Sequence, residues 1–412
     1  MYNPNKIYDV DLRPPYVRFV DRFFLFLILC LPFERAFIHD GEGAFLQYFV
    51  ILFALFTIPI WRRYYGRWCC GVWLYFIFLI VGSFSDYLTC RKLGVPFVAL
   101  SLRVWIMFYF LLVSYNLASR HRYYLMKILT FLLTFSVIVT ISQWLGLGGE
   151  FFEEKGVEGG RVAVLGANLN ASARDVSLQV IFGFLVFVNG IVVSRTKKLF
   201  IVGLAILSFG ALIRTGSRGG LAALVCTLPI AVFTTKNISK KIFYVACVFV
   251  TLLLIGFVVM NTPSILDRVN KAVYSGDTGG REYIFHLTMY YWSLAKYIGH
   301  GCFAYQIVMG PEFGWHMLAT HCTYTYALVS AGLVGGIFYY LFLIFTLFRA
   351  FMIRFQRYGG FLLLVTVYSL LGGITMNIEF TKWLYIIYGL IFAADRLSKK
   401  DKFNFVISNS IN

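Results

Sequence analysis

The chain has 412 residues, of which 59% are hydrophobic, 19% aromatic and only 14% charged, and its formal net charge is +18. Apolar stretches of about 17 to 25 residues recur along it, which is the length needed to cross a bilayer core and argues against a soluble globular fold. The composition therefore predicts an all-α polytopic membrane protein, organised as a single transmembrane domain over residues 1–412.

Hydropathy predicts about 12 transmembrane helices. They are expected at residues 19–38, 43–60, 71–88, 96–117, 124–147, 175–194, 199–214, 219–235, 242–260, 318–348, 359–376 and 381–395. Residues 1–18 lack the apolar core and the small-residue cleavage site of a signal peptide, so the first of these helices is expected to remain in the mature protein.

Two of the connections between the predicted spans are long, and both fall on the same side of the membrane. The first is the outer loop at residues 148–174, which is rich in glycine and carries Arg161, Asn168 and Asn170 before the sixth span. Polar and basic side chains in a loop of this length are able to contact a substrate.

The second long connection, residues 261–317, is a large outer loop between spans 9 and 10. Arg281 follows two glycines within it and begins a stretch with helical periodicity. Apolar residues recur there at spacings of three and four: Ile284, Leu287, Tyr291, Leu294 and Ile298. This stripe predicts an interfacial helix that lies along the membrane surface.

Positive charge is concentrated in the short connections and in both terminal segments, whereas the long connections carry bases and acids in similar numbers. Under the positive-inside rule, both termini are cytoplasmic and the two long loops face the periplasm. Topology and attraction to the anionic inner leaflet explain the net charge, so no nucleic-acid partner is expected.

The segment "RTGSRGGLAAL", residues 214–224, places Arg214 and Arg218 on the outer side, where topology alone would not put them. Gly219 and Gly220 allow close approach to the main chain, and a helix is expected to begin there with its positive dipole end facing the same spot. Guanidinium groups at that position suit a phosphate-bearing ligand. Snorkelling to the interface or pairing with a carboxylate is an equally good interpretation of these arginines.

The tenth predicted span opens with "HCTYTYALVSAGLVGG", which puts His321 at its outer mouth. An imidazole there is suited to accept a proton from a hydroxyl near neutral pH, although a plain hydrogen-bonding role is the simpler alternative. Gly332 and Gly335 are predicted to let another helix pack closely. The spacing of histidines and cysteines does not match a zinc site, and a disulfide between Cys302 and Cys322 is left open.

Three of these motifs occur in a recognisable order: "TGSRGGLAAL" (215–224), "GGREYIFHLTMYYW" followed by "IGHG" (279–301), and the spacing from His321 to Gly332 and Gly335. Together they resemble the O-antigen ligase and polymerase family of bacterial integral membrane glycosyltransferases. The segment "GANLNASA" (166–173) is also similar to the asparagine-containing segment of that family. Cys322 departs from the pattern, which usually has Asn, Ser or Gln there.

The resemblance implies a glycosyltransferase of the bacterial inner membrane that moves a glycan from undecaprenyl diphosphate to an acceptor hydroxyl at the periplasmic face, as a ligase or a polymerase. The acceptor would be the lipid A core, another glycan or a protein, and no metal or cofactor is implied. Arg218 and Arg281 would bind the diphosphate, and His321 would take the proton of the acceptor. The further candidates for substrate binding are Arg214, Arg161, Asn168, Asn170, Gly219 and Gly220.

The alternative function is a transporter or flippase for a lipid-linked or small anionic substrate. Ion-coupled carriers usually keep carboxylates near the middle of the membrane, whereas Asp21 and Asp175 lie at the ends of predicted spans and Arg103 is the clear intramembrane charge. The sequence also lacks the inverted repeat that many carriers contain.

Overall fold

The computed structural model describes residues 13–34, 45–147, 150–152, 161–163, 165, 169–189, 194–261, 266, 270, 274, 280–314 and 318–411. The helices are α1 (Pro15–Cys30), α2 (Phe45–Thr57), α3 (Trp61–Tyr64), α4 (Cys70–Leu93), α5 (Phe97–Ala118), α6 (Arg122–Leu145), α7 (Leu169–Asn189), α8 (Arg195–Thr215), α9 (Arg218–Thr227), α10 (Ile238–Met260), α12 (Arg281–Leu294), α13 (Ala304–Met309), α14 (Thr323–Met352), α15 (Gly359–Gly372) and α16 (Lys382–Ile411). Two short strands, β1 (Glu150–Phe152) and β2 (Arg161–Ala163), pair antiparallel. The predicted helical fold is confirmed, with this small ribbon as an addition in the outer loop.

Each predicted span overlaps helical structure, and within the described residues seven helices are long and apolar enough to cross a membrane. These seven are Leu46–Tyr64, Cys70–Leu93, Arg122–Leu145, Leu169–Val188, Arg195–Thr215, Ile238–Phe257 and Thr323–Met352. Three further apolar helices are shorter, at Val104–Ala118, Arg218–Thr234 and Gly359–Gly372. The chain is therefore an integral membrane protein, and the total of about 12 spans remains a prediction.

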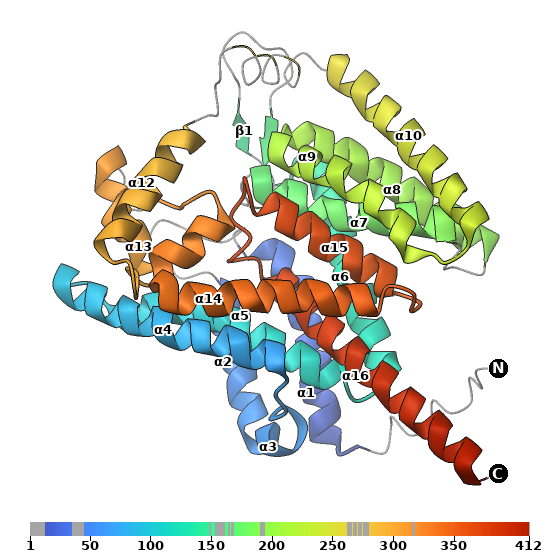
Figure 1. Ribbon diagram of the computed structural model, residues 1–412, viewed down its shortest axis with the longest axis horizontal. Helices are drawn as coiled ribbons and strands as arrows, with labels where there is room; N and C mark the ends of the chain where they lie inside the picture. Colours follow the sequence, from blue (N-terminus) through green and yellow to red (C-terminus); the bar gives the residue numbers. More distant parts are fainter. Residues whose placement is uncertain are drawn as a thin grey trace.

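The helices pack as two neighbouring groups (Figure 1). In one group α7 packs against α6, α8 and α9, and α15 packs against α9. In the other, α14 lies along α4, and α16 lies along α5. Buried aromatic side chains fill the centre of this second group, where the Tyr75 ring lies 4.9 Å from that of Tyr385 and 5.0 Å from that of Phe342. Such rings supply close packing in a membrane, where lipid gives helices no hydrophobic reason to associate.

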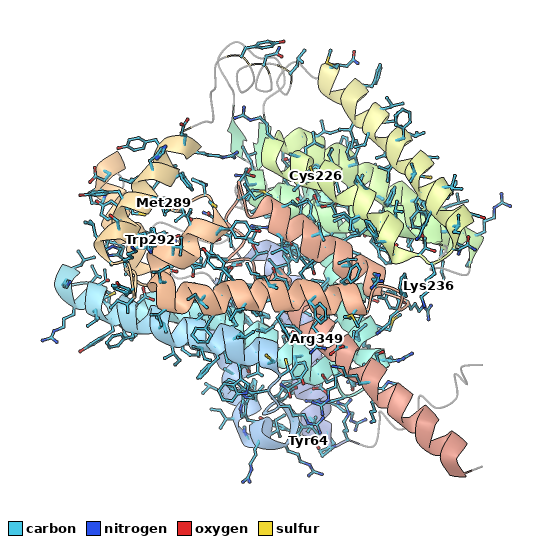
Figure 2. All side chains as sticks on the ribbon, viewed as in Figure 1. Tyr64, Cys226, Lys236, Met289, Trp292 and Arg349 are labelled. Atoms are coloured by element: carbon cyan, nitrogen blue, oxygen red, sulfur yellow. The ribbon has the colours of Figure 1, made fainter. Side chains whose placement is uncertain are left out.

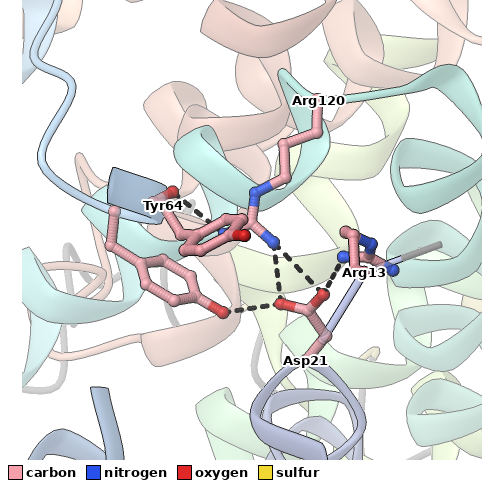
Figure 3. Close-up of polar contacts among 5 residues, drawn as sticks. Arg13, Asp21, Tyr64 and Arg120 are labelled. Carbon is pink, nitrogen blue, oxygen red and sulfur yellow. Dashed lines mark hydrogen bonds and ion pairs between the residues drawn. The ribbon is translucent and has the colours of Figure 1, made fainter. Parts of the chain in front are cut away.

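A buried carboxylate ties together the helix ends on the side predicted to be cytoplasmic (Figure 3). Asp21 of α1 is 2% exposed and is paired with Arg13 and with Arg120, whose Nη1 lies 2.9 Å from Asp21 Oδ1. The Tyr65 hydroxyl donates to the same oxygen at 2.6 Å, and Arg120 donates to the carbonyl of Tyr64 at 2.9 Å. With every charge partnered, this cluster fixes α1 against the start of α6 and the α3 turn.

Helix α14 is broken at Gly332, and a segment from the second outer loop is inserted at the break. In an unbroken helix the amides of Leu333 and Val334 would donate to the carbonyls of Val329 and Ser330. Instead they donate to the carbonyls of Lys296 and Tyr297, at 2.9 and 3.0 Å, and the vacated carbonyls accept from the amides of His300 and Gly301, at 2.7 and 2.8 Å. We call this exchange of backbone bonds between residues 296–301 and 329–334 the splice.

The splice provides hydrogen-bond partners for backbone N–H and C=O groups at the break in α14, partners that lipid could not supply. The splice depends on Gly332, which has a φ of +61°. A Cβ on this residue would clash with the carbonyl of Tyr297. A side chain on Gly299 would in turn come within 2.5 Å of the carbonyl of Ser330. Gly332 therefore serves a different purpose from the helix packing predicted for it, whereas Gly335 packs against Val81 of α4 as predicted.

The splice also corrects the predicted interfacial helix. Helix α12 forms as expected, and Ile284 and Leu287 are buried. It ends at Leu294, which is 59% exposed, and Ile298 lies beyond it in the splice. Ile298 fits the apolar spacing of α12 in the sequence but lies in a non-helical segment. There the Ser85 hydroxyl of α4 donates to the carbonyl of Ile298.

Candidate active site

His321 and Arg281 lie within electrostatic reach of each other, although 40 positions separate them in the chain. Arg281 is the first residue of α12, and His321 lies two residues before α14 in a left-handed conformation, with φ of +53°. Burial lowers the pKa of His321, and the positive charge of Arg281 lowers that pKa further. The imidazole is therefore neutral at physiological pH and lies within electrostatic reach of a guanidinium.

The junction of α8 and α9 is held by Ser217, the N-cap of α9. Its hydroxyl oxygen accepts from the amide of Gly220 at 3.2 Å and donates to Asn170 Oδ1 of α7 at 2.8 Å. Gly216, with a φ of +60°, ends α8 and makes the tight turn possible. Arg218 follows as the first residue of α9 and is half-buried.

Gly219 and Gly220 are both buried against protein. A side chain on Gly219 would come within 2.5 Å of Thr375 Oγ1 and 3.6 Å of Met376 Cγ. One on Gly220 would come within 3.0 Å of Ala173 Cβ. Close helix packing thus accounts for these two glycines, and their predicted contact with substrate remains a prediction.

The connection between α15 and α16, which we call the 373–381 loop, joins the α9 start to the α14 start. Thr323, the first residue of α14, donates its amide to the carbonyl of Gly373 at 2.8 Å and its hydroxyl to the carbonyl of Met376 at 3.2 Å. Since Met376 also faces Gly219, the segments that carry Arg218 and His321 rest on the same loop.

Glu379 is a buried carboxylate in this loop, 2% exposed, that the sequence analysis did not single out. It accepts from Thr323 Oγ1 at 2.7 Å, and its Oε1 has no hydrogen-bond partner within the described part of the chain. Burial raises the pKa of Glu379 to about 7, against the opposing effects of hydrogen bonds, including the one from Thr323, and of the positive charge of Arg174. Arg174 of α7 is itself tied to the loop, since its Nη1 donates to the carbonyl of Asn377 at 2.6 Å.

The raised pKa of Glu379 predicts a stability that depends on pH. Because the folded protein holds this proton more tightly than the unfolded chain, the stabilisation is complete below the unfolded value of about 4.5 and is lost as the pH rises through about 7. We expect Glu379→Gln to remove this dependence and to exceed the wild type in stability above pH 7 by roughly 3 kcal/mol. Thermal unfolding of the wild type and of Glu379→Gln in detergent, between pH 5 and pH 8, measures this difference in stability.

The exposed acid Glu312 provides the matched control for this experiment. Glu312→Gln removes one carboxylate that is exposed and accepts a hydrogen bond from Tyr291 at 3.0 Å, so its slope of stability against pH is the reference for that of Glu379→Gln. An unchanged slope in Glu379→Gln would contradict the assignment of the titration to Glu379.

Three further predicted substrate ligands have different surroundings. Arg214 donates to the carbonyl of Trp144 at 3.2 Å and stacks over its ring at 5.1 Å, which anchors the end of α8 to the end of α6. The backbone of Arg161 is in β2, while its side chain and the whole of Asn168 lie outside the described residues. Asn170 contacts Ser217, as given above.

Asp86 is a second buried acid that the sequence analysis overlooked. It lies within α4, and its Oδ1 accepts from the amides of Phe303 at 3.0 Å and Ala304 at 2.8 Å, so it caps α13. Cys302 beside it is a free, buried thiol, and Cys322 is also free, so the structure contains no bond between these two cysteines. The acid therefore has a structural role, since it holds the start of α13 against α4.

Comparison with known families gives the decisive observation. The family model for O-antigen ligase matches residues 203–340, a segment that runs from α8 to beyond the splice and contains Arg218, Arg281 and His321. This segment is similar to the O-antigen ligase family. It includes both the splice and the candidate site. No curated protein matches the chain.

Proposed function

We propose that the protein moves a glycan from undecaprenyl diphosphate to an acceptor hydroxyl at the periplasmic face of the bacterial inner membrane. The proposal is carried by the electrostatic influence of Arg281 on His321 within the segment that matches the O-antigen ligase model. The start of α9 and the start of α14 also rest on the same 373–381 loop. Both termini are then cytoplasmic, as the charge distribution predicts.

The reaction needs positive charge where the diphosphate leaves. The bond from the anomeric carbon to the phosphate oxygen breaks, and the electron pair departs with the lipid diphosphate. Arg218 and Arg281 would bind the phosphate oxygens in forked geometry, and the free amides at the start of α9 would add to their effect. Cations fixed in place before the reaction stabilise this charge as it develops.

His321 would act as the general base. As the acceptor oxygen bonds to the anomeric carbon, its proton passes to the imidazole, which must be neutral to receive it. Burial and Arg281 both favour the neutral form, as the lowered pKa of His321 indicates. Thr323 and Glu379 would hold the main chain around His321 through their 2.7 Å hydrogen bond.

The remaining contacts to substrate would come from residues around this centre. Asn170 is placed beside the α9 start, where it would contact the diphosphate or the first sugar. The residues Arg214, Arg161, Asn168, Gly219 and Gly220 are proposed to line the donor path. The acceptor is a lipid A core, another glycan or a protein.

Reconstitution tests the proposal against the transporter. Purified protein in liposomes is supplied with a fluorescent glycan on undecaprenyl diphosphate and with candidate acceptors. The proposal expects a new, larger glycoconjugate and release of undecaprenyl diphosphate. Movement of the intact lipid-linked glycan across the bilayer, with no new glycosidic bond for any of the three acceptor classes, would instead favour a flippase.

A further inference from the structure

A pocket of about 240 Å³ lies at the end of the helix bundle opposite to the candidate active site. It is lined by Cys69, Cys70, Tyr115, Phe345, Arg349, Phe392, Asp395, Arg396 and Lys399. Figure 2 labels Arg349 where α14 lies beside α16. The catalytic proposal uses none of these residues.

The lining residues come from the ends of four helices that meet at the pocket. Cys69 and Cys70 precede the apolar part of α4, and Tyr115 lies in the last turns of α5. Arg349 ends the apolar run of α14, and Asp395 ends that of α16. These are the ends that the positive-inside rule places in the cytoplasm, which puts the pocket among the headgroups of the inner leaflet.

The polar side of the pocket has a positive charge excess, with three bases and one acid among the lining residues. Asp395 lies 3.3 Å from Arg349 Nη1 and 2.8 Å from Lys399 Nζ, so one carboxylate is shared between two cations. Arg396 donates to the Tyr115 hydroxyl at 3.1 Å, a neutral partner. Two of the three positive charges are therefore not balanced by an acid of the pocket.

The other side of the pocket is apolar. The rings of Phe345 and Phe392 lie 5.8 Å apart, and the Arg349 guanidinium stacks on Phe345 at 4.7 Å. A free phosphate ion would gain nothing from these rings. An amphiphile whose phosphate meets the cations and whose glycerol and upper acyl chain meet the rings would use both sides.

We propose that this pocket binds the headgroup of an acidic phospholipid of the inner leaflet. Its volume suits a phosphodiester headgroup, while the acyl chains remain in the bilayer along α14 and α16. The bound phosphate would bridge Arg349 and Arg396, and so would join the ends of α14 and α16.

The two cysteines of the pocket allow a direct test on the wild-type protein. In mixed micelles, alkylation of Cys70 by N-ethylmaleimide is followed by peptide mass spectrometry, and Cys226, exposed on α9, is the internal reference. We expect phosphatidylglycerol at ten times its Kd to slow the labelling of Cys70 about tenfold, since only the unoccupied fraction reacts. Phosphatidylcholine should leave the rate unchanged, and Cys226 should react equally in both lipids.

Substitutions then assign the effect to the pocket. Arg349→Gln and Arg396→Gln should each abolish most of the protection, whereas Lys400→Gln, next to the pocket on α16 but not lining it, should retain it. Arg396→Gln breaks no ion pair of the pocket, so it remains informative if Arg349→Gln fails to fold. Equal protection by phosphatidylcholine, full protection in both arginine variants, or equal protection by millimolar inorganic phosphate would each overturn the proposal.

Discussion

His321→Ala and Arg281→Ala are each expected to lower the rate of glycan transfer at least about a hundredfold, because a general base and a cation at the leaving group each contribute that much or more. The rate is measured in proteoliposomes with saturating lipid-linked glycan. Thermal unfolding of each variant should stay close to that of the wild type, because both side chains are partly exposed at the edge of the helix bundle.

Matched controls lie in the same outer region. His286 is an exposed histidine on α12, and Lys296 is an exposed base whose carbonyl, rather than its side chain, enters the splice. His286→Ala and Lys296→Ala should each retain transfer within about threefold, as is usual for surface positions. Normal transfer by His321→Ala would refute its role as the base.

The lowered pKa of His321 adds a second readout. A base must be neutral to act, so the transfer rate should stay level at neutral pH and fall only as the pH drops below the usual histidine value of 6.5. Burial is the larger cause of this lowered pKa and the charge of Arg281 the smaller. Replacing Arg281 by glutamine removes the second cause, so the pH below which the rate falls should move upward. No change in this pH would mean that Arg281 does not influence the base.

Gly332→Ala should destabilise the protein by about 3 kcal/mol or more. Two costs add: strain at a φ of +61°, and a methyl group driven into the carbonyl of Tyr297. Relief would require breaking the hydrogen bonds of the splice, which leaves backbone groups unsatisfied inside the membrane. Thermal unfolding in detergent and the yield of monodisperse protein measure the loss.

Gly203 of α8 and Gly256 of α10 are the controls for this prediction, since a Cβ at either would meet no atom within 4 Å. Gly203→Ala and Gly256→Ala should be neutral or should stabilise by up to about 1 kcal/mol, the intrinsic helix preference for alanine. A Gly332→Ala protein that unfolds at the wild-type temperature would show that the splice does not hold α14.

The sequence predicts the helices of this protein well, because hydropathy records the thickness of the bilayer directly. The ordered motifs also single out Arg281 and His321, which the fold brings within electrostatic reach of each other, while their roles stay predictions. The role of Gly332 could not be predicted, since the carbonyl that its backbone faces belongs to Tyr297, 35 positions away. A glycine in an apolar stretch has the same local sequence pattern whether it lets a neighbouring helix pack closely or marks a break in its own helix.

Glu379 and Asp86 were missed for a related reason. Each is a single acid near the end of a span, where sequence alone cannot distinguish an exposed loop carboxylate from one buried against another segment. Their importance comes from Thr323 and from the amides of residues 303 and 304, which only the tertiary fold brings to them. Tertiary partners of this kind leave no periodic signal in the sequence.

The splice has a consequence for substitutions near the candidate site. Residues 281 and 321 are connected through α12, the hydrogen bonds of the splice, and the part of α14 that precedes Gly332. The backbone positions of residues 281 and 321 are thus tied to each other by main-chain hydrogen bonds. Phe285 and Tyr290 are exposed on α12, so we expect substitutions of either side chain to leave the backbone spacing of residues 281 and 321 unchanged.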